Sequence, residues 1–181
     1  MIHAGRVRLR ALQRGDGPAL ARLYAANRDR FADSFPKSVA ALVDDEAGEA
    51  YVAERAAEWT ARKAYWFGIW LRETLVGQIQ IKNLDWSVPK GEIAYLLDRE
   101  AEGRGYMTET FEAILRVAFG ELGLGKLFLR AIVGNERSAR LARRFGFTRE
   151  GVLREEFATL DGRRVDLEYY GLLAREFKGP A

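Results

Sequence analysis

The stretch that most constrains the fold is a glycine-rich turn at residues 100–109, with the sequence EAEGRGYMTE. It lies between a short apolar run and a long helical pattern. A turn that leads into a helix exposes backbone N–H groups without partners, and the helix dipole adds partial positive charge there. Gly103 and Gly105 tolerate a positive φ and leave room for close approach. The turn is therefore either a tight connection or a cradle for phosphate oxygens.

Composition excludes several kinds of chemistry. The 181 residues, 48% hydrophobic and 30% charged, are typical of one globular domain spanning residues 1–181. The chain has no cysteine, no run of 18 apolar residues and a single histidine, His3. We therefore expect no membrane span, disulfide, thiolate nucleophile, Ser–His triad or metal site. The N-terminus lacks the apolar core of a signal peptide, which favours a cytoplasmic protein.

The net charge of +3 is compatible with an anionic cofactor and too small to indicate a nucleic-acid partner.

Hydrophobic periodicity predicts a mixed α/β chain. Helical spacing is clearest after the turn, at Met107, Phe111, Ile114, Leu115 and Ala118. Asp44 and Asn135 are predicted N-caps, and Asp161-Gly162 predicts a hairpin turn. Alternating aromatic residues in 65–70 indicate core and sheet face rather than a ligand cage. The expected helices are 16–30, 44–62, 105–122 and 135–145, and the expected strands are 7–12, 65–71, 75–81, 91–97, 126–133, 148–159 and 164–172.

Three blocks of the chain resemble the GNAT superfamily of acyl-CoA-dependent N-acyltransferases. They are GEIAYLLD (91–98) with EGRGYMTE (102–109), NERS (135–138) leading to RRFGFT (143–148), and EGVLR (150–154) with DGRRVD (161–166). The blocks follow the family's order and span nearly the whole chain. The branch most similar is the Rim type, the ribosomal-protein N-terminal acetyltransferases, which residues 27–36 also resemble. The resemblance implies a GNAT fold, α/β (α+β), with a mixed sheet of about seven strands splayed at the cofactor site and about four helices.

The resemblance also implies an acetyl-CoA-dependent N-acetyltransferase that acts on a primary amine, with the N-terminal α-amine of a protein or peptide as the expected acceptor. Two alternatives stay open: a small amine such as an amino acid, polyamine or antibiotic, and a non-catalytic CoA-binding module. Without cysteine or a usable histidine, we expect direct attack in a ternary complex rather than a covalent acyl-enzyme. A homodimer is expected because dimers are common in the family.

The family's phosphate loop usually begins with Gln or Arg, and here Glu100 takes that place. The backbone N–H groups that follow can still bind the pyrophosphate, and Arg104 either adds a cation or is a solvated surface residue. Backbone N–H groups at residues 95–97 are the expected oxyanion hole. The expected cofactor-binding residues are Tyr95, Leu96, Leu97, Gly103, Arg104, Gly105, Tyr106, Met107, Thr108, Asn135 and Ser138.

The resemblance places Ser138 near the coenzyme's sulfur. Many GNAT enzymes carry a tyrosine four residues later that protonates the leaving thiolate, whereas this chain has Ala142. Ser138 or a water therefore takes that role if an acid is needed. Glu92 matches a general base of some GNAT enzymes and could instead be a strand-end carboxylate paired with an arginine. Glu156 lies near the position where Rim-type enzymes carry another candidate base. An insertion before Asp161 leaves the register open by one residue, so Glu155 is the alternative at that position.

Overall fold

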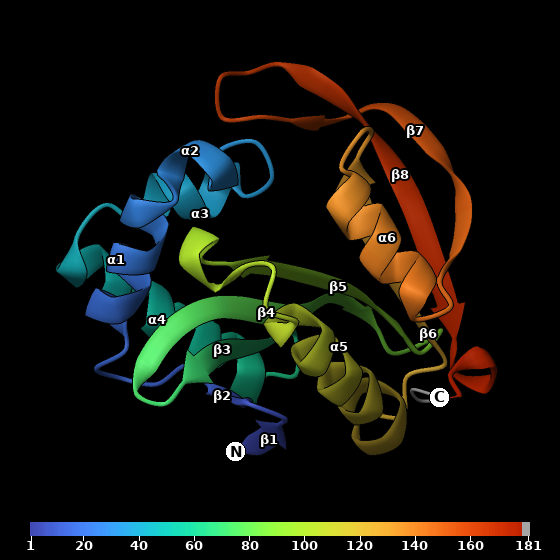
Figure 1. The fold of residues 1–181 in the computed structure, drawn as a ribbon, viewed down its shortest axis with the longest axis horizontal. Helices are drawn as coiled ribbons and strands as arrows, with labels where there is room; N and C mark the ends of the chain where they lie inside the picture. The colour runs from blue at the N-terminus through green and yellow to red at the C-terminus, as the bar shows by residue number, and fades with distance from the viewer. Residues whose placement is uncertain (179–181) are drawn as a thin grey trace.

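The chain folds around one mixed sheet of eight strands in the order β1-β2-β3-β4-β5-β6-β8-β7 (Figure 1). The structure is a computed structural model, which describes residues 1–178. Neighbouring strands run antiparallel, apart from the parallel pair β5 and β6. The strands are β1 (Ile2–Ala4), β2 (Val7–Ala11), β3 (Tyr65–Leu71), β4 (Thr74–Asp85), β5 (Lys90–Leu97), β6 (Lys126–Ile132), β7 (Thr148–Ala158) and β8 (Arg164–Leu173).

Helices pack on both faces of the sheet, as the mixed α+β prediction requires. The helices are α1 (Gly17–Ala26), α2 (Arg28–Phe31), α3 (Pro36–Ala41), α4 (Asp45–Thr60), α5 (Tyr106–Arg116) and α6 (Glu136–Arg144). Asp44 and Asn135 cap α4 and α6 with their side chains, as predicted. None of the helices among residues 1–178 is long and apolar enough to cross a membrane.

The structure has more helices and strands than the sequence predicts. Strand β1 has only three residues, too few for a readable period. The helix predicted over 16–30 ends at Ala26 because Asn27 is drawn into other contacts: its Nδ2 donates to the Leu23 carbonyl, and its Oδ1 accepts from the Arg99 N–H, both at 3.0 Å. Helices α1 and α2 therefore take the place of the one predicted helix, and α3 is a further short helix that the sequence did not predict.

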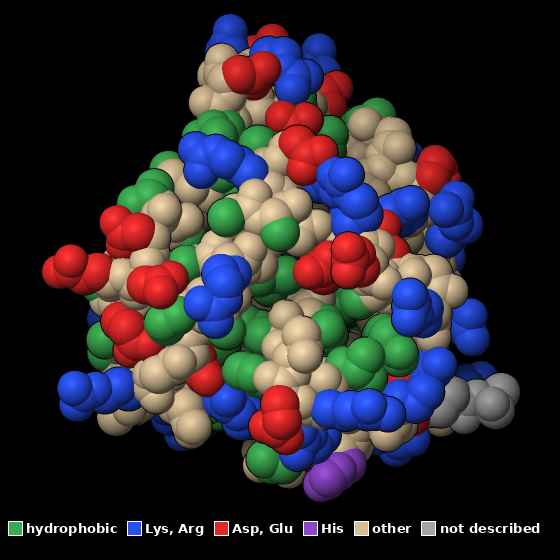
Figure 2. Space-filling model, turned by 60° about the vertical axis from the view of Figure 1, so that its left-hand side comes forward, with side chains coloured by type: hydrophobic (Ala, Val, Ile, Leu, Met, Phe, Trp, Pro, Cys, Tyr) green, Lys and Arg blue, Asp and Glu red, His purple; other side chains and the backbone are tan. Residues whose placement is uncertain are grey.

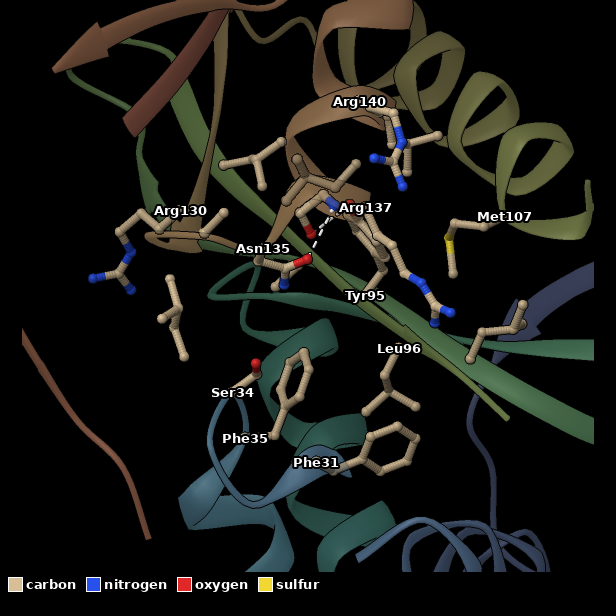
Figure 3. A pocket seen from close by; sticks show the side chains of 18 of the residues that line it. Phe31, Ser34, Phe35, Tyr95, Leu96, Met107, Arg130, Asn135, Arg137 and Arg140 are labelled. Atoms are coloured by element: carbon tan, nitrogen blue, oxygen red, sulfur yellow. Dashed lines mark hydrogen bonds between the residues drawn. The ribbon is translucent and has the colours of Figure 1, made fainter. Parts of the chain in front are cut away.

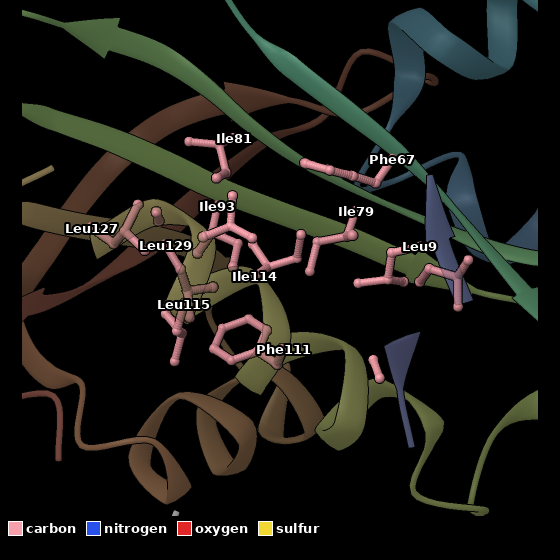
Figure 4. Close-up of a cluster of buried hydrophobic side chains, with 14 of the residues drawn as sticks. Leu9, Phe67, Ile79, Ile81, Ile93, Phe111, Ile114, Leu115, Leu127 and Leu129 are labelled. Carbon is pink, nitrogen blue, oxygen red and sulfur yellow. The ribbon is translucent and has the colours of Figure 1, made fainter. Parts of the chain in front are cut away.

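The two faces of the sheet build two apolar clusters. Side chains alternate along β3, so Tyr65, Phe67 and Ile69 join one cluster, whereas Trp66 and Trp70 join the other. This burial confirms that the aromatic run belongs to the core. The first cluster packs Phe111, Ile114 and Leu115 of α5 beneath Ile79, Ile81 and Ile93 of the sheet (Figure 4).

Strands β5 and β6 pair over only three positions, ending at Glu92 opposite Phe128. Beyond that point β5 stays with β4 as far as Leu97, and β6 stays with β8 as far as Ile132. The two central strands therefore diverge, as the predicted splay requires. The divergence leaves the edge of β5 that faces β6 without a strand partner, and a cavity opens there.

Candidate active site

The cavity between the diverging strands has a volume of about 690 Å³. Its walls come from β5, β6, the glycine-rich turn, α6 and the segment around α2. Figure 3 shows Tyr95 and Asn135 near its middle, with Met107 on one side and Arg130, Ser34 and Phe35 towards the other. Below, the end near Met107 is called the cofactor end and the end near Arg130 the acceptor end.

The glycine-rich turn leaves its backbone donors free. Gly103 and Gly105 have φ values of +72° and +83°, in the left-handed region that favours glycine. Gly105 is the N-cap of α5, and among residues 1–178 no N–H group from 103 to 108 donates a hydrogen bond to the protein. A Cβ built at Gly103 would meet nothing within 4 Å. Free donors in open space at a helix start fit the phosphates of acetyl-CoA.

Arg6, near the N-terminus, holds this turn through several hydrogen bonds. Arg6 donates from Nε to Glu109 Oε1 at 2.8 Å and from its backbone N–H to Glu109 Oε2 at 2.8 Å. Its Nη2 also donates to the Arg104 carbonyl at 2.5 Å, and its guanidinium stacks on Tyr106. These contacts fix both the backbone before Gly105 and the first turn of α5.

Basic side chains dominate the charged lining of the cavity. Arg137, Arg140 and Arg144 recur at helical spacing on α6, which gives them one shared face. Among residues 1–178, two carboxylates line the cavity, and both are paired: Glu92 with Arg130, and Glu102 with Arg30 and Arg137 together. The basic lining residues are Arg30, Lys82, Arg130, Arg137, Arg140 and Arg144.

A hydroxyl pair lies where β5 and α6 meet. The Tyr95 hydroxyl is 3.0 Å from the Ser138 hydroxyl, and either oxygen can be the donor. Asn135 Oδ1 accepts from the Ser138 N–H at 3.2 Å, which holds Ser138 in the first turn of α6. Burial raises the pKa of Tyr95 to about 12, against the opposing effect of the Ser138 hydrogen bond, so the phenol stays protonated at neutral pH.

Glu92 is a buried carboxylate in a dense polar cluster. It accepts from Arg130 Nε at 3.1 Å and Nη2 at 2.8 Å, and from Asn83 Nδ2 at 2.5 Å. Asn83 has a positive φ of +49° within an irregular stretch of β4 that faces β5. The Lys82 ammonium lies 4.0 Å from Glu92 Oε1. A carboxylate has about four lone-pair sites, so roughly one remains for a substrate.

Most of the predicted site residues line this cavity, and two do not. Arg104 is exposed and contributes its carbonyl to Arg6 instead. Glu156 is exposed, within an irregularity of β7 between Leu153 and Phe157. Three residues on β7 oppose one on β8 there, which breaks the alternation that would have placed Glu156. Residues Glu92, Tyr95, Leu96, Leu97, Gly103, Gly105, Tyr106, Met107, Thr108, Asn135 and Ser138 do line it.

The basic side chains that line the cavity were not predicted from the sequence. The helical spacing of Arg137, Arg140 and Arg144 beside the phosphate turn was a readable signal. Lys82 and Arg130 gave no such signal, because strand pairing alone brings them to Glu92. On the face drawn in Figure 2, basic side chains are interspersed with acidic ones rather than gathered into one stripe.

A mixed sheet splayed between β5 and β6, with free backbone N–H groups at the glycine-rich turn before α5, is the arrangement expected of acyl-CoA-dependent acetyltransferases. The chain belongs to the GNAT acetyltransferase family, whose acetyltransferase (GNAT) domain matches residues 6–148. It is 32% identical over 179 residues to YdaF of Bacillus subtilis (strain 168), a protein provisionally named a ribosomal N-acetyltransferase. That match covers 96% of this chain and 94% of YdaF.

Solved structures agree on the fold. Ribosomal-protein-S5-alanine acetyltransferase from Vibrio fischeri has a TM-score of 0.89 at 20% identity, covering 98% of both chains. Spermidine N-acetyltransferase from Vibrio cholerae, in complex with CoA and spermine, has a TM-score of 0.79 at 25% identity, covering 94% of this chain and 97% of that one. The chain is therefore an N-acetyltransferase with acetyl-CoA as its donor, and its relatives use more than one kind of acceptor.

Proposed function

We propose that this enzyme acetylates the N-terminal α-amine of a protein or peptide. The observation that carries the proposal is the scarcity of free carboxylates in the cavity: Glu92 and Glu102 are both paired with arginines. An α-amine has a pKa of about 8 and is partly neutral at pH 7, whereas a lysine amine at about 10.4 needs a strong base. A cavity poor in free bases suits the α-amine.

Acetyl-CoA supplies a thioester carbonyl for attack and a thiolate that leaves. In the proposed mechanism the free N–H groups of residues 103–108 hold the phosphates. The arginines of α6 lie beside them, and backbone N–H groups at residues 95–97 polarise the carbonyl. Holding the amine against the carbonyl removes much of the entropic barrier.

Ser138 is the proposed proton donor at the leaving sulfur. Its hydroxyl lies 3.0 Å from the Tyr95 hydroxyl, which can donate to Ser138 while Ser138 donates towards the sulfur. The pair is held rigidly, because the Tyr95 ring packs edge-on against Phe111 at 5.4 Å and Asn135 fixes the Ser138 backbone.

Glu92 is the proposed acceptor of the proton that the nitrogen loses once it has attacked the carbonyl, a step that needs no strong base. It is the carboxylate at the acceptor end of the cavity and keeps about one lone-pair site. Its ion pair with Arg130 also fits a purely structural role for Glu92. The Glu92→Gln variant described in the Discussion distinguishes the catalytic role from the structural one. Glu156 is the second candidate, from outside the cavity lining.

The alternative acceptor is a small amine, which the likeness to spermidine N-acetyltransferase favours. The deciding experiment offers acetyl-CoA with N-terminal peptides, free amino acids and spermidine, and follows CoA release and product mass. Acetylation at the peptide α-amine, with weak or no turnover of spermidine, is expected. Turnover of small amines alone would assign the enzyme to the second class.

We also propose that the enzyme is cytoplasmic and that it forms a homodimer, as expected from the sequence. Light scattering after size-exclusion chromatography tests the dimer directly.

A further inference from the structure

We infer that the acceptor end of the cavity binds an anionic group, so that the enzyme prefers peptides with Asp or Glu just after the N-terminal residue. This inference rests on the proposed function, because it specifies the peptide acceptor. It is carried by two cations that line the cavity at the Glu92 cluster, Lys82 on β4 and Arg130 on β6.

Both cations have donors to spare. Among residues 1–178, the Lys82 ammonium makes no hydrogen bond, and Glu92 at 4.0 Å is its nearest ion-pair partner. Arg130 uses Nε and one N–H of Nη2 on Glu92, which leaves Nη1 without a protein partner in the same part of the chain. A guanidinium fork and an ammonium side by side are donors that a carboxylate accepts well.

The local charge favours an anion. Lys82, Arg130 and Glu92 sum to one positive charge, and Glu92 is already committed to Arg130. Burial lowers the pKa of Lys82, and Glu92 opposes that effect, so the lysine is poorly solvated and gains from an anionic partner. Two further charges act on these cations: Lys37 lowers the pKa of Lys82, whereas Glu156, together with Tyr169, raises the pKa of Arg130.

A second cationic centre, as in a polyamine, would meet repulsion at the same place. Such like-charge contacts in a partly desolvated site are a common means of rejecting a substrate.

The distances agree with an acidic side chain early in the peptide. Glu92 and Tyr95 are three residues apart on β5, so their side chains lie on opposite faces of the sheet, and the cavity in the gap between β5 and β6 is lined by both. Their separation along the strand is about 10 Å at roughly 3.3 Å per residue. An extended acceptor whose amine lies beside Tyr95 and Ser138 covers about 3.3–3.6 Å per residue. Its second or third residue therefore reaches Lys82 and Arg130.

The test measures binding separately from catalysis. Three fluorescein-labelled peptides share an N-terminal Ser and differ at the next two positions: Asp-Glu, Asn-Gln or Lys-Lys. Their Kd values for the enzyme with CoA are compared by fluorescence anisotropy. A charged hydrogen-bonded contact predicts about tenfold tighter binding of the acidic peptide than of the amide peptide. High salt should reduce that preference.

Variants locate the preference. Lys82→Met should remove most of it and Lys82→Arg should retain it, while Lys90→Met is the matched control. Lys90 belongs to the same sheet, pairs with Asp85 at 3.7 Å and does not line the cavity. Equal binding of the acidic and amide peptides, or a preference unchanged in Lys82→Met, would overturn the inference.

Acetyl transfer to the same peptides tests the proposed function independently. Tight binding of the acidic peptide without acetylation would contradict the function and leave the charge preference standing. Acetylation of all three peptides with equal Kd values would support the proposed function and overturn the charge preference.

Discussion

At the scale of single residues, the candidate site has a hydroxyl at Ser138 and an alanine, Ala142, at the position where the family often has a tyrosine. Ala142 is fully buried in the core, so a tyrosine placed there would overpack α6 against the sheet. Tyr95 instead brings a phenol from β5 to within 3.0 Å of Ser138. The aromatic hydroxyl is therefore present in this chain, on a different element.

Ser138→Ala should lower kcat about 10–100-fold, because a hydrogen bond to a charged group contributes roughly 1.5–3 kcal/mol. Tyr95→Phe should lower kcat by a smaller factor while the Kd for acetyl-CoA stays nearly unchanged. If the two hydroxyls act as one unit, the double variant loses less than the product of the single losses. Steady-state kinetics of the three variants checks this. Full activity of Ser138→Ala would show that Ser138 is only a first-turn residue of α6 and takes no part in the reaction.

Glu92→Gln should lower kcat by about 10²-fold and remove the acidic limb of the kcat profile, because general-base help is worth roughly 10²–10⁴-fold. Leaving Arg130 without its carboxylate should also reduce the Tm. A reduced Tm with an unchanged pH profile would make Glu92 a purely structural partner of Arg130. The same profile for Glu156→Gln decides between the two carboxylates.

At the scale of elements, the conformation of the turn before α5 depends on its glycines and on hydrogen bonds from Arg6, which is distant in the sequence. Gly105 takes a left-handed φ as the N-cap, and Arg6 holds the Arg104 carbonyl and Glu109 on either side of it. The helix start is thus fixed with its N–H groups unpaired. For the phosphate binding proposed above, such preorganisation keeps the loss of conformational entropy small.

Gly105→Val should weaken acetyl-CoA binding by at least about tenfold, because a Cβ at this position would lie 3.2 Å from Arg6 Nη2 and displace the guanidinium that holds the turn in place. The matched control is Gly162→Val in the β7–β8 turn, where φ is +82° compared with +83° at Gly105. Both variants bear the backbone strain of a β-branched residue at positive φ, and only Gly105 belongs to the cavity lining. Calorimetric titration with acetyl-CoA separates them, and equal Kd values would contradict the phosphate-binding role.

At the scale of the whole molecule, the cavity joins distant parts of the chain. Figure 1 shows the β7–β8 hairpin reaching over towards α2, and there Arg163 pairs with Asp33 at 3.0 Å. Phe157 and Leu167 of the hairpin line the cavity together with Phe31 and Phe35 of the N-terminal segment. The acceptor end is therefore enclosed by two segments that lie more than half the chain apart.

The pH dependence of the whole reaction should follow the acceptor amine. With a peptide, kcat/KM should rise about tenfold per pH unit and level off near ~8, where the α-amine becomes neutral. Tyr95, with a pKa of about 12, should cause no loss below that pH.

The preference for acidic peptides should fade at alkaline pH as Lys82 loses its proton. Burial lowers the pKa of Lys82, with Arg130 and Lys37 acting in the same direction and Glu92 against it, so the loss should come below the ordinary lysine value of ~10.4. Peptide Kd values measured across this pH range check the prediction. A preference that persists above that value would contradict it.

Features that depend on local order could be predicted from the amino-acid sequence. The helical spacing of α5, the caps at Asp44 and Asn135, the glycines of the turn and the hairpin at Asp161-Gly162 are all readable within a few residues, because the forces that set them act over that range. The splay between β5 and β6 was also expected, from the family resemblance. Tertiary structure alone decided what each strand residue faces. Pairing across the sheet placed Arg130 and Lys82 on Glu92, an irregularity in β7 moved Glu156 out of the cavity lining, and Arg6 reached the phosphate turn from more than a hundred residues away. Charge partners of this kind depend on register and on chain reversal, which no local pattern records.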